Sequence, residues 1–305
     1  MNELIVREEY SATIVERDVL SMFLGQLTPN TRKAYEKDIL QFCVLIGCPK
    51  ENLHGLPAGD LFEYGTRFAR DDRYSTASRA RRLSSVRSYL QFLCSIGILY
   101  RNPLENVSTA KVKNKRKDIL SDEDVEKIFK SINTSTRAGA RDFLALLLLV
   151  EQGLRRNEIL SIKYGDITKN VEGRTVAKVT RKGDRDDERP LSRRSIEAIE
   201  RCKELDGLTV VSPGTHIIRN KFGNRMSGQR LFEIIKEYAR KSGIEKEISP
   251  HSFRHYAITD AAKVEDSVPK LMQFSGHQSA STLGRYIHFK NTEAITSIQE
   301  KRGIH

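Results

Sequence analysis

The sequence contains no tryptophan, few cysteines and no long apolar run. Its longest uninterrupted apolar stretch, FLALLLLV at 143–150, is much shorter than the roughly 20 residues that a membrane-spanning helix requires. The stretch therefore predicts a buried helix of a globular domain. The N-terminal sequence MNELIVREEY lacks the basic segment followed by an apolar segment that marks a secretory signal peptide. Both absences favour a cytoplasmic protein with no membrane-spanning segment.

The cysteines form no recognisable metal-binding or disulfide pattern. None of the four belongs to a CxxC pair, and no histidine lies beside one at the spacing of a zinc site. We expect them to be reduced thiols, and we expect no bound metal. These residues are Cys43, Cys48, Cys94 and Cys202.

Positive charge, by contrast, is in excess. The 305 residues include 52 Lys and Arg against 40 Asp and Glu, which gives a formal net charge of +12. Such an excess favours a polyanionic partner, either nucleic acid or an anionic membrane surface. The length is sufficient for about two domains.

The N-terminal part of the chain has the pattern of amphipathic helices. In 27–47, apolar residues recur every three or four positions, which predicts one buried face. The segment 75–97 has an apolar stripe and an opposite face that carries arginines and serines. The stripe contains Leu83, Val86, Leu90 and Leu93, and the opposite face contains Ser78, Arg81, Arg82, Ser85 and Ser88.

Positive charge is concentrated between residues 73 and 117. This region holds eleven Lys and Arg residues and a single acid, Glu105. A charged run is often only a solvated surface, but basic residues mixed with serines on one helix face also suit contacts with phosphates and base edges. The basic segment KVKNKRKD at 111–118 would track a phosphate backbone. The candidate DNA-binding residues are Arg79, Arg81, Arg82, Ser85, Arg87, Lys111, Lys113, Lys115 and Arg116.

The C-terminal part combines helices with a small antiparallel sheet. The segment TVAKVT at 175–180 alternates as a strand does, RKGDRDDE predicts a turn, and RPLS at 189–192 predicts the returning strand. Capping and apolar patterns predict further helices at 120–132, 139–152, 192–205, 227–242, about 250–263 and about 267–275.

These patterns predict a mainly α protein, of the α+β class, with two domains. We place an N-terminal helical domain at 1–108 and a basic linker at 109–118. A mostly helical domain with the small antiparallel sheet would follow at 119–290, and a C-terminal tail at 291–305.

Two basic residues are candidates for a functional site. Arg155, in EQGLRRNEIL, follows a buried apolar helix and a glycine, so its guanidinium requires an anionic partner. The neighbouring acid Glu158 is the simplest partner. Lys182 lies in the predicted hairpin turn RKGD, where a lysine is usually only solvated.

A histidine and an arginine follow in SPHSFRHY. Ser249 can cap a helix and Pro250 can occupy its first position, which places His251 beside the positive end of the helix dipole. Arg254, three residues on, shares that face. A histidine and an arginine at a helix N-terminus suit a phosphate.

The stretch FSGHQSASTLGRYIHF at 274–289 places His277 nine residues before Tyr286. In isolation it has two interpretations. One is a capped surface helix with a tyrosine in the core, and the other is a nucleophilic tyrosine.

In this order, these residues resemble the catalytic set of the tyrosine site-specific recombinases. GLRRNEIL is similar to the first arginine box of that family, the spacing from SPHSFRHY to Gly-His fits its second box, and RYIHF resembles its RYxH ending. In the N-terminal half, TRKAYEKDILQF and RARRLSSVRSYLQFLCSIGILYRNPLENV resemble the family's core-binding domain. The resemblance extends over residues 12–290. The departures are Gln152, Phe253 and the second arginine Arg156, and none of them removes a catalytic group.

The resemblance implies a fold and a chemistry. The fold would be a SAM-like core-binding domain joined to a catalytic domain of the DNA breaking-rejoining type. A tyrosine would attack a DNA phosphodiester and form a 3′-phosphotyrosine, which conserves the bond energy, so no metal, ATP or other cofactor is expected. The implied catalytic residues are Arg155, Lys182, His251, Arg254, His277 and the nucleophile Tyr286, with Glu158 as structural support.

The family also implies partners. They are duplex DNA with an inverted-repeat core site and a homotetramer in the synaptic complex, in which residues 291–305 would dock into a neighbouring protomer. The core-binding domain starts almost at residue 1, so no additional arm-binding domain is expected. A type IB topoisomerase and a catalytically silent DNA-binding regulator are the rival functions. DNA integration or excision, Xer-type dimer resolution and transposon recombination stay open as biological roles of a cytoplasmic, nucleoid-associated enzyme.

Overall fold

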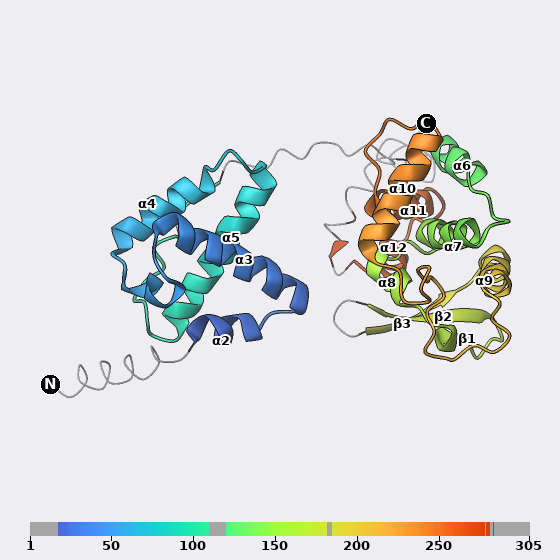
Figure 1. Cartoon of the computed structure of the whole chain (residues 1–305), viewed down its shortest axis with the longest axis horizontal. Helices are drawn as coiled ribbons and strands as arrows, with labels where there is room; N and C mark the ends of the chain where they lie inside the picture. The colour runs from blue at the N-terminus through green and yellow to red at the C-terminus, as the bar shows by residue number, and fades with distance from the viewer. Residues whose placement is uncertain (1–17, 110–119, 182–184, 278, 281–282, 284–305) are drawn as a thin grey trace, which may run out of the picture. The chain divides into compact units, whose positions relative to one another are not determined.

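The structure is a computed structural model of the chain, and it describes residues 18–109, 120–181, 185–277, 279–280 and 283. The chain divides into two compact units, Met1–Lys115 and Arg116–His305 (Figure 1). Of the linker predicted at 109–118 only the first residue is described, and the predicted tail lies outside the described residues. The domain boundaries drawn from the sequence therefore stay predictions.

The N-terminal unit is a bundle of helices. Asp18 and Ser75 begin two of them by accepting hydrogen bonds from N–H groups of the first turn, and Gly47 ends another in the left-handed conformation. The two amphipathic patterns of the sequence correspond to the two longest helices. The elements are α2 (Val19–Gly25), α3 (Pro29–Ile46), the 3₁₀ segment η1 (Lys50–Gly55), α4 (Ala58–Ala69) and α5 (Thr76–Ser95).

Helix α5 packs against α2, α3 and α4. Its apolar stripe lies in the core as predicted, but its opposite side is not exposed throughout. Arg82 and Ser85 on that side are only 3% and 0% exposed. The prediction that these two residues bind DNA is therefore wrong. Amphipathic spacing shows which residues share a face, but not how many faces of a helix its neighbours cover.

Arg82 instead stabilises the interior of the unit. Its guanidinium carbon lies 4.1 Å from the centroid of the Phe68 ring and 3.6 Å from that of Tyr74. Its Nη1 atom forms an ion pair with Asp71 at 3.4 Å. Hydrogen bonds from the exposed Arg73, and to a lesser degree from Arg82, lower the pKa of Asp71 to about 2.

A carboxylate is buried between α3 and α5. Asp38 is 1% exposed, and both of its oxygens accept hydrogen bonds from the guanidinium of Arg81. The hydroxyl of Ser85 donates to the same carboxylate at 2.8 Å. The ion pair therefore joins two core helices, although the side chain of Arg81 is 49% exposed.

Three candidate DNA-binding arginines of α5 keep part of their surface exposed. They are Arg79, Arg81 and Arg87. Each of them also binds its own unit. Arg87, for example, donates to the carbonyl oxygens of Leu104 and Val107 and so holds the segment after α5 against the helix. Their contact with DNA stays a prediction.

The C-terminal unit contains helices and a small sheet. Every helix predicted for this part is present to within a few residues, and the short helix α8 is additional. The elements are α6 (Asp122–Lys130), α7 (Arg137–Gln152), α8 (Arg156–Ser161), η2 (Tyr164–Asp166), β1 (Ile167–Lys169), β2 (Thr175–Arg181), β3 (Arg185–Pro190), α9 (Arg193–Leu205), α10 (Gly228–Lys241), α11 (Pro250–Val264) and α12 (Val268–Ser275).

The sheet is antiparallel, with strand order β1-β2-β3. The register pairs Val176 with Pro190 and Arg181 with Arg185. The returning strand thus begins at Arg185, and the prediction that it begins at Arg189 is wrong. The charged residues RDDE have the composition of a turn, but their backbone continues the ladder with β2.

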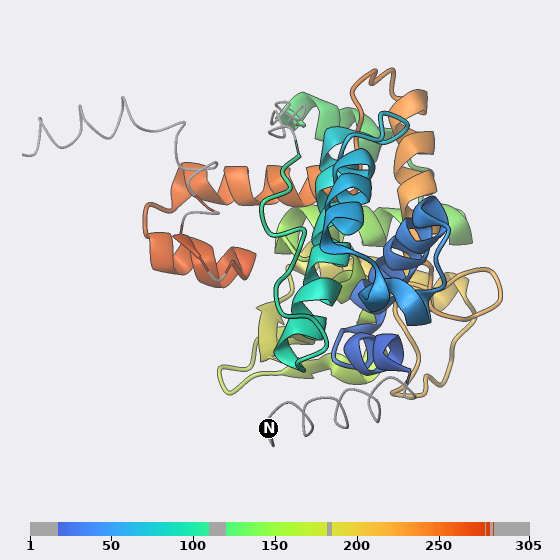
Figure 2. The same cartoon turned by 90° about the vertical axis from the view of Figure 1, so that its left-hand side faces the viewer.

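Helix α7 is the centre of the second core. The apolar run at 143–150 belongs to it, and residues 144–149 are at most 1% exposed, so the predicted buried helix is confirmed. The helix packs against α9 and α11. Helices α11 and α12 lie side by side (Figure 2). In the part of the chain that the structure describes, no helix is both long and apolar enough to cross a membrane.

Replacing Arg81 by Met should destabilise the N-terminal unit, because the buried carboxylate of Asp38 loses its charged partner. Breaking a buried pair from one side costs about 3–5 kcal/mol, and we expect about 2–3 kcal/mol here because half of the Arg81 side chain is exposed. Hydrogen–deuterium exchange of the α3 and α5 amides measures this change. Arg101→Met, which breaks an exposed pair with Glu105, is the control. Equal exchange in the two variants would contradict the assignment.

Candidate active site

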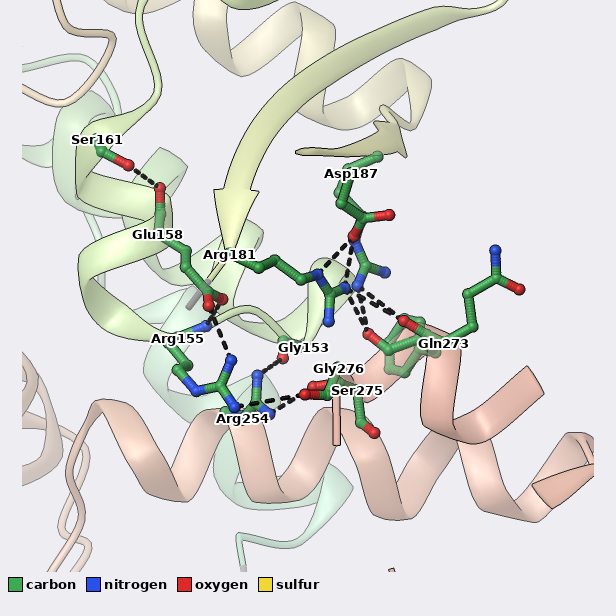
Figure 3. Close-up of polar contacts among 12 residues, drawn as sticks. Gly153, Arg155, Glu158, Ser161, Arg181, Asp187, Arg254, Gln273, Ser275 and Gly276 are labelled. Atoms are coloured by element: carbon green, nitrogen blue, oxygen red, sulfur yellow. Dashed lines mark hydrogen bonds and ion pairs between the residues drawn. The ribbon is translucent and has the colours of Figure 1, made fainter. Parts of the chain in front are cut away.

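The turn between α7 and α8 presents Arg155. Gly153 ends α7 in the left-handed conformation, with φ 56°, and a Cβ at this position would lie 2.8 Å from the ring of Phe274. Glu158 accepts hydrogen bonds from the backbone N–H of Arg155 at 2.7 Å and from its Nη1 at 2.9 Å. The Nη2 atom of Arg155 lies 3.5 Å from the carbonyl oxygen of Gly276 (Figure 3). The acid and the carbonyl thus orient the guanidinium.

The start of α11 presents His251 and Arg254. Ser249 caps this helix, as its sequence predicts. Arg254 is 3% exposed and donates from Nη1 to the carbonyl oxygen of Gly153 and from Nη2 to that of Ser275, both at 2.5 Å. His251 is exposed. The buried arginine therefore joins α11 to the α7–α8 turn and to the end of α12.

The end of α12 places His277 next to these groups. Gly276 terminates the helix with φ 64°, and its missing Cβ would lie only 1.6 Å from Nη1 of Arg181. Any larger residue would displace that guanidinium. His277 follows directly and is half-buried.

A pocket of about 310 Å³ opens where α8 and α11 begin. No carboxylate is among its lining residues, and two of them are the arginines just described. Such a pocket suits an anion, which guanidinium groups bind with paired N–H donors. Among the residues that the structure describes, no group of His, Cys, Asp and Glu side chains gathers where it could hold a metal ion. The pocket is lined by Arg155, Arg156, Phe232, Ser249, Pro250, His251 and Arg254.

The surrounding positive charge acts on His277. Burial first, and then the charges of Arg254 and Arg155, lower the pKa of His277 from 6.5 to about 4. At neutral pH the imidazole is therefore uncharged and has one N–H donor and one acceptor nitrogen. A bound anion would reduce the positive potential and raise this pKa again.

The structure brings Arg155, His251, Arg254 and His277 together, and it leaves the other two predicted catalytic residues undescribed. The nearest described residues are Arg181, directly before Lys182, and Leu283, three residues before Tyr286. Leu283 is fully buried in a cluster with residues of α11 and α12. The predicted site residues outside the described part of the chain are Lys111, Lys113, Lys115, Arg116, Lys182 and Tyr286.

A second group of charged residues adjoins the site, and our sequence analysis missed it. Arg181 and Arg189 both pair with Asp187 and donate to carbonyl oxygens at the end of α12 (Figure 3). The signal was strand alternation. Arg181 lies two residues after Val179, a core residue, so a strand that includes both places Arg181 on the core-facing side.

We expect the imidazole of His277 to stay neutral in an NMR titration of the protein until the pH falls to about 4. Because the pKa is lowered in the folded state, the unfolded chain binds a proton first. His277 therefore contributes a loss of stability as the pH falls from about 6.5 to about 4. His277→Gln identifies the resonance, and Arg155→Met should raise its midpoint. A midpoint near 6.5 in the unmodified protein would contradict the burial and charge argument.

Comparison with known protein families identifies both units. Residues 118–293 match the model of the phage integrase family, and residues 23–97 match the N-terminal SAM-like domain of phage integrases. The first match alone covers more than half of the chain.

Individual relatives agree with the family models. The chain is 30% identical over 293 residues to the tyrosine recombinase XerD of Listeria monocytogenes, and the alignment covers 94% of each protein. Its fold is similar to that of the XerH site-specific recombinase in a post-cleavage complex with a palindromic difH substrate, with a TM-score of 0.71 and 20% identity over 88% of this chain and 79% of that one. It is also similar to lambda integrase in a tetramer bound to a Holliday junction, with a TM-score of 0.65 and 17% identity over 92% of this chain and 75% of that one.

The fold class predicted from the sequence is thereby confirmed, including the SAM-like N-terminal domain. The family models match most of the chain, and a tyrosine recombinase aligns with it over 94% of each protein. The chain therefore belongs to the phage integrase family of tyrosine recombinases and is a site-specific recombinase that transfers DNA strands.

Proposed function

We propose that the chain cuts and rejoins duplex DNA through a covalent bond between Tyr286 and the 3′ phosphate of the cleaved strand. The observation that carries this proposal is one pocket without a carboxylate, at which Arg155, His251 and Arg254 converge. His277 follows at the adjacent end of α12. Paired cationic donors and a neutral imidazole are the groups that a reacting phosphodiester requires.

The two arginines would bind the non-bridging oxygens of the scissile phosphate. In the structure the Nη groups of Arg155 and Arg254 are oriented by backbone carbonyl oxygens. A phosphate is a stronger acceptor than a carbonyl because it is charged. Negative charge builds up on its oxygens during the attack, and oriented donors stabilise that charge most. His277 would add a donor to the same oxygens.

Tyr286 would supply the nucleophile. Its phenolic oxygen would bond to phosphorus while the bond from phosphorus to the 5′ oxygen breaks. A phenol has a pKa of about 10, so the attack needs nearby cations and a proton acceptor. His251, exposed at the start of α11, would take the proton or bond the phosphate.

Lys182 would protonate the departing 5′ oxygen as a general acid. The 5′-hydroxyl of a partner strand would then attack the phosphotyrosine, restore a phosphodiester and return the proton to the phenol. Each step exchanges one phosphoester for another, so the reaction requires neither ATP nor a metal. Glu158 would take no part in proton transfer and would hold Arg155 in place.

We propose duplex DNA with an inverted-repeat core site as the partner, and a tetramer as the assembly that exchanges strands. The palindromic substrate of XerH and the tetrameric lambda integrase complex support this proposal. Residues 291–305 would dock into a neighbouring protomer. Contacts with phosphates would come from Arg79, Arg81 and Arg87 and from the linker residues Lys111, Lys113, Lys115 and Arg116. Acting on chromosomal DNA would place the enzyme in the cytoplasm.

The two rival functions have less support. Relaxation by a type IB topoisomerase needs no partner strand, whereas the family and the aligned relative are recombinases. A silent regulator does not need the four described catalytic candidates to adjoin one another. The target DNA would distinguish integration or excision from dimer resolution.

Tyr286→Phe should abolish covalent attachment to DNA while leaving DNA binding intact, because only the phenolic oxygen is lost. Detergent lysis of the source cells, recovery of protein–DNA adducts and sequencing of the attached ends measure this directly. Attached DNA in the wild type alone would identify both the nucleophile and the target site. Adducts with Tyr286→Phe would show that another residue attacks.

Arg155→Ala and Arg254→Ala should each lower the rate of DNA cleavage by about 10²–10³-fold, as loss of a transition-state donor does. A suicide substrate that traps the covalent intermediate reports the rate, and circular dichroism establishes that the buried Arg254 variant is folded. Arg201→Ala, which removes an exposed arginine paired with Glu204 on α9, is the control. Near-normal cleavage by both active-site variants would refute the phosphate contact.

A further inference from the structure

The β2–β3 hairpin carries charged residues on the side that faces the core. Val179 pairs with Asp187 in the register, and Ala177 pairs with Arg189. Both apolar partners are buried, so Asp187 and Arg189 lie on the core-facing side. Arg181 lies on the same side, two residues beyond Val179. The neighbouring Asp186 points to the other side of the sheet.

Asp187 holds the two arginines together. Its Oδ2 atom accepts a hydrogen bond from Nε of Arg181 at 2.6 Å and lies 2.8 Å from Nε of Arg189. The side chains of Arg181 and Arg189 are only 10% and 7% exposed, and that of Asp187 is 23% exposed. One carboxylate thus orients two nearly buried guanidinium groups.

Both guanidinium groups bind the last turn of α12. Nη2 of Arg181 donates to the carbonyl oxygens of Gln273 and Phe274 at 3.3 and 3.2 Å. Nη2 of Arg189 donates to the same two oxygens. The last carbonyls of a helix have no partner within the helix and form the negative end of its dipole. These contacts therefore fix the end of α12 to the hairpin.

The ring of Phe274 extends this contact to the catalytic arginines. The guanidinium of Arg189 lies 5.5 Å from the ring centroid. The ring also fills the space beside Gly153, whose carbonyl oxygen accepts a hydrogen bond from Arg254. The β2–β3 hairpin, α12 and the turn between α7 and α8 are thus packed around the ring of Phe274.

Arg181 also reaches the residue before His277. Its Nη1 lies where a Cβ of Gly276 would be, and this atom is buried with no hydrogen-bond partner among the described residues. Four arginines thus bind successive carbonyl oxygens at the end of α12.

Arg181 and Arg189 donate to the carbonyl oxygens of Gln273 and Phe274. Arg254 donates to that of Ser275, and Arg155 donates to that of Gly276.

Burial of two arginines with one carboxylate is costly for a surface hairpin, since each ion loses its hydration. A hairpin does not need such a cluster for its own stability. Apart from Asp187, the two arginines donate their hydrogen bonds to the end of α12. Burial first, then the charges of Arg254, Arg155 and His251, and last that of Arg181 lower the pKa of His277.

We propose that Arg181, oriented by Asp187, is a positioning residue that holds the end of α12, and with it His277, against Arg155 and Arg254. It does not contact DNA itself. The inference rests on the proposed cleavage reaction and assigns a further residue to it. Displacement of a catalytic group by about 1 Å lowers a rate by up to about 10²-fold. Loss of this support should therefore lower the rate of the chemical step and leave the affinity for DNA unchanged.

The adjacent acids of β3 provide a matched test. Asp187→Asn and Asp186→Asn change the net charge equally, but only the first removes the carboxylate that orients Arg181. Cleavage of a suicide substrate at saturating DNA should fall about 10-fold in Asp187→Asn and about 10- to 100-fold in Arg181→Met. Asp186→Asn should cleave at the wild-type rate, and the dissociation constant for DNA should match that of the wild type in Arg181→Met.

The leaving group distinguishes the two ways in which Arg181 could act. A substrate with a 5′-bridging sulfur releases a thiolate, which needs no general acid. If Arg181 acted through Lys182, the next residue in the chain, sulfur would restore the rate of Arg181→Met. We expect no restoration, because Arg181→Met would displace His277, which in the proposed reaction contacts the non-bridging oxygens and not the leaving group. Lys182→Ala is the positive control, and sulfur should restore its rate.

Each outcome decides a separate question. Wild-type cleavage by Arg181→Met and Asp187→Asn, a loss confined to DNA affinity, or restoration by sulfur would each overturn the positioning role. An equal loss in Asp187→Asn and Asp186→Asn would show a general effect of charge and would also overturn it. Absence of covalent cleavage by the wild type would instead refute the proposed function.

Discussion

Hydrogen bonds from guanidinium groups to the carbonyl oxygens at the end of α12 hold the active site together. A helix ends with carbonyls that have no partner in the helix, and arginine is suited to bind them because its donors are fixed in a rigid fork. Arginines from β2, β3, α11 and the start of α8 meet there. The turn between α7 and α8, the β2–β3 hairpin and α11 are thereby fixed around the end of α12, directly before His277.

The acids near this site are placed so that the pocket stays cationic. Glu158 pairs with Arg155, and Asp187 pairs with Arg181 and Arg189, but neither carboxylate lines the pocket. The acids orient the arginines without occupying the side that a phosphate would approach. Burial, together with the same excess of positive charge, lowers the pKa of His277 and keeps it neutral, so a neutral imidazole and several permanent cations lie close together.

Much of this arrangement was predictable, and the failures have physical reasons. Helix positions followed from capping and apolar spacing, and the order of Arg, His and Tyr motifs indicated the family that the comparisons confirmed. The buried face of α5 with Arg82 and Ser85 was missed because periodicity does not count a helix's neighbours. Strand β1 is too short to show a pattern. The cluster around Asp187 was missed because the sequence RDDE has the composition of a turn. Only the strand register shows that these residues belong to β3 and that Asp187 faces the core.

The orientation of Arg254 and Arg155 by backbone oxygens has a consequence for the energetics of the proposed phosphate binding. Long side chains lose up to about 2 kcal/mol of conformational entropy when they are ordered. Here that ordering occurs when the domain folds, because backbone oxygens already hold the guanidinium groups of Arg254 and Arg155. An arriving phosphate meets preorganised donors and need not immobilise them, so more of its interaction energy is retained as affinity. In the proposed reaction, the carbonyl oxygens at the end of α12 thus orient the arginines that would bind the phosphate.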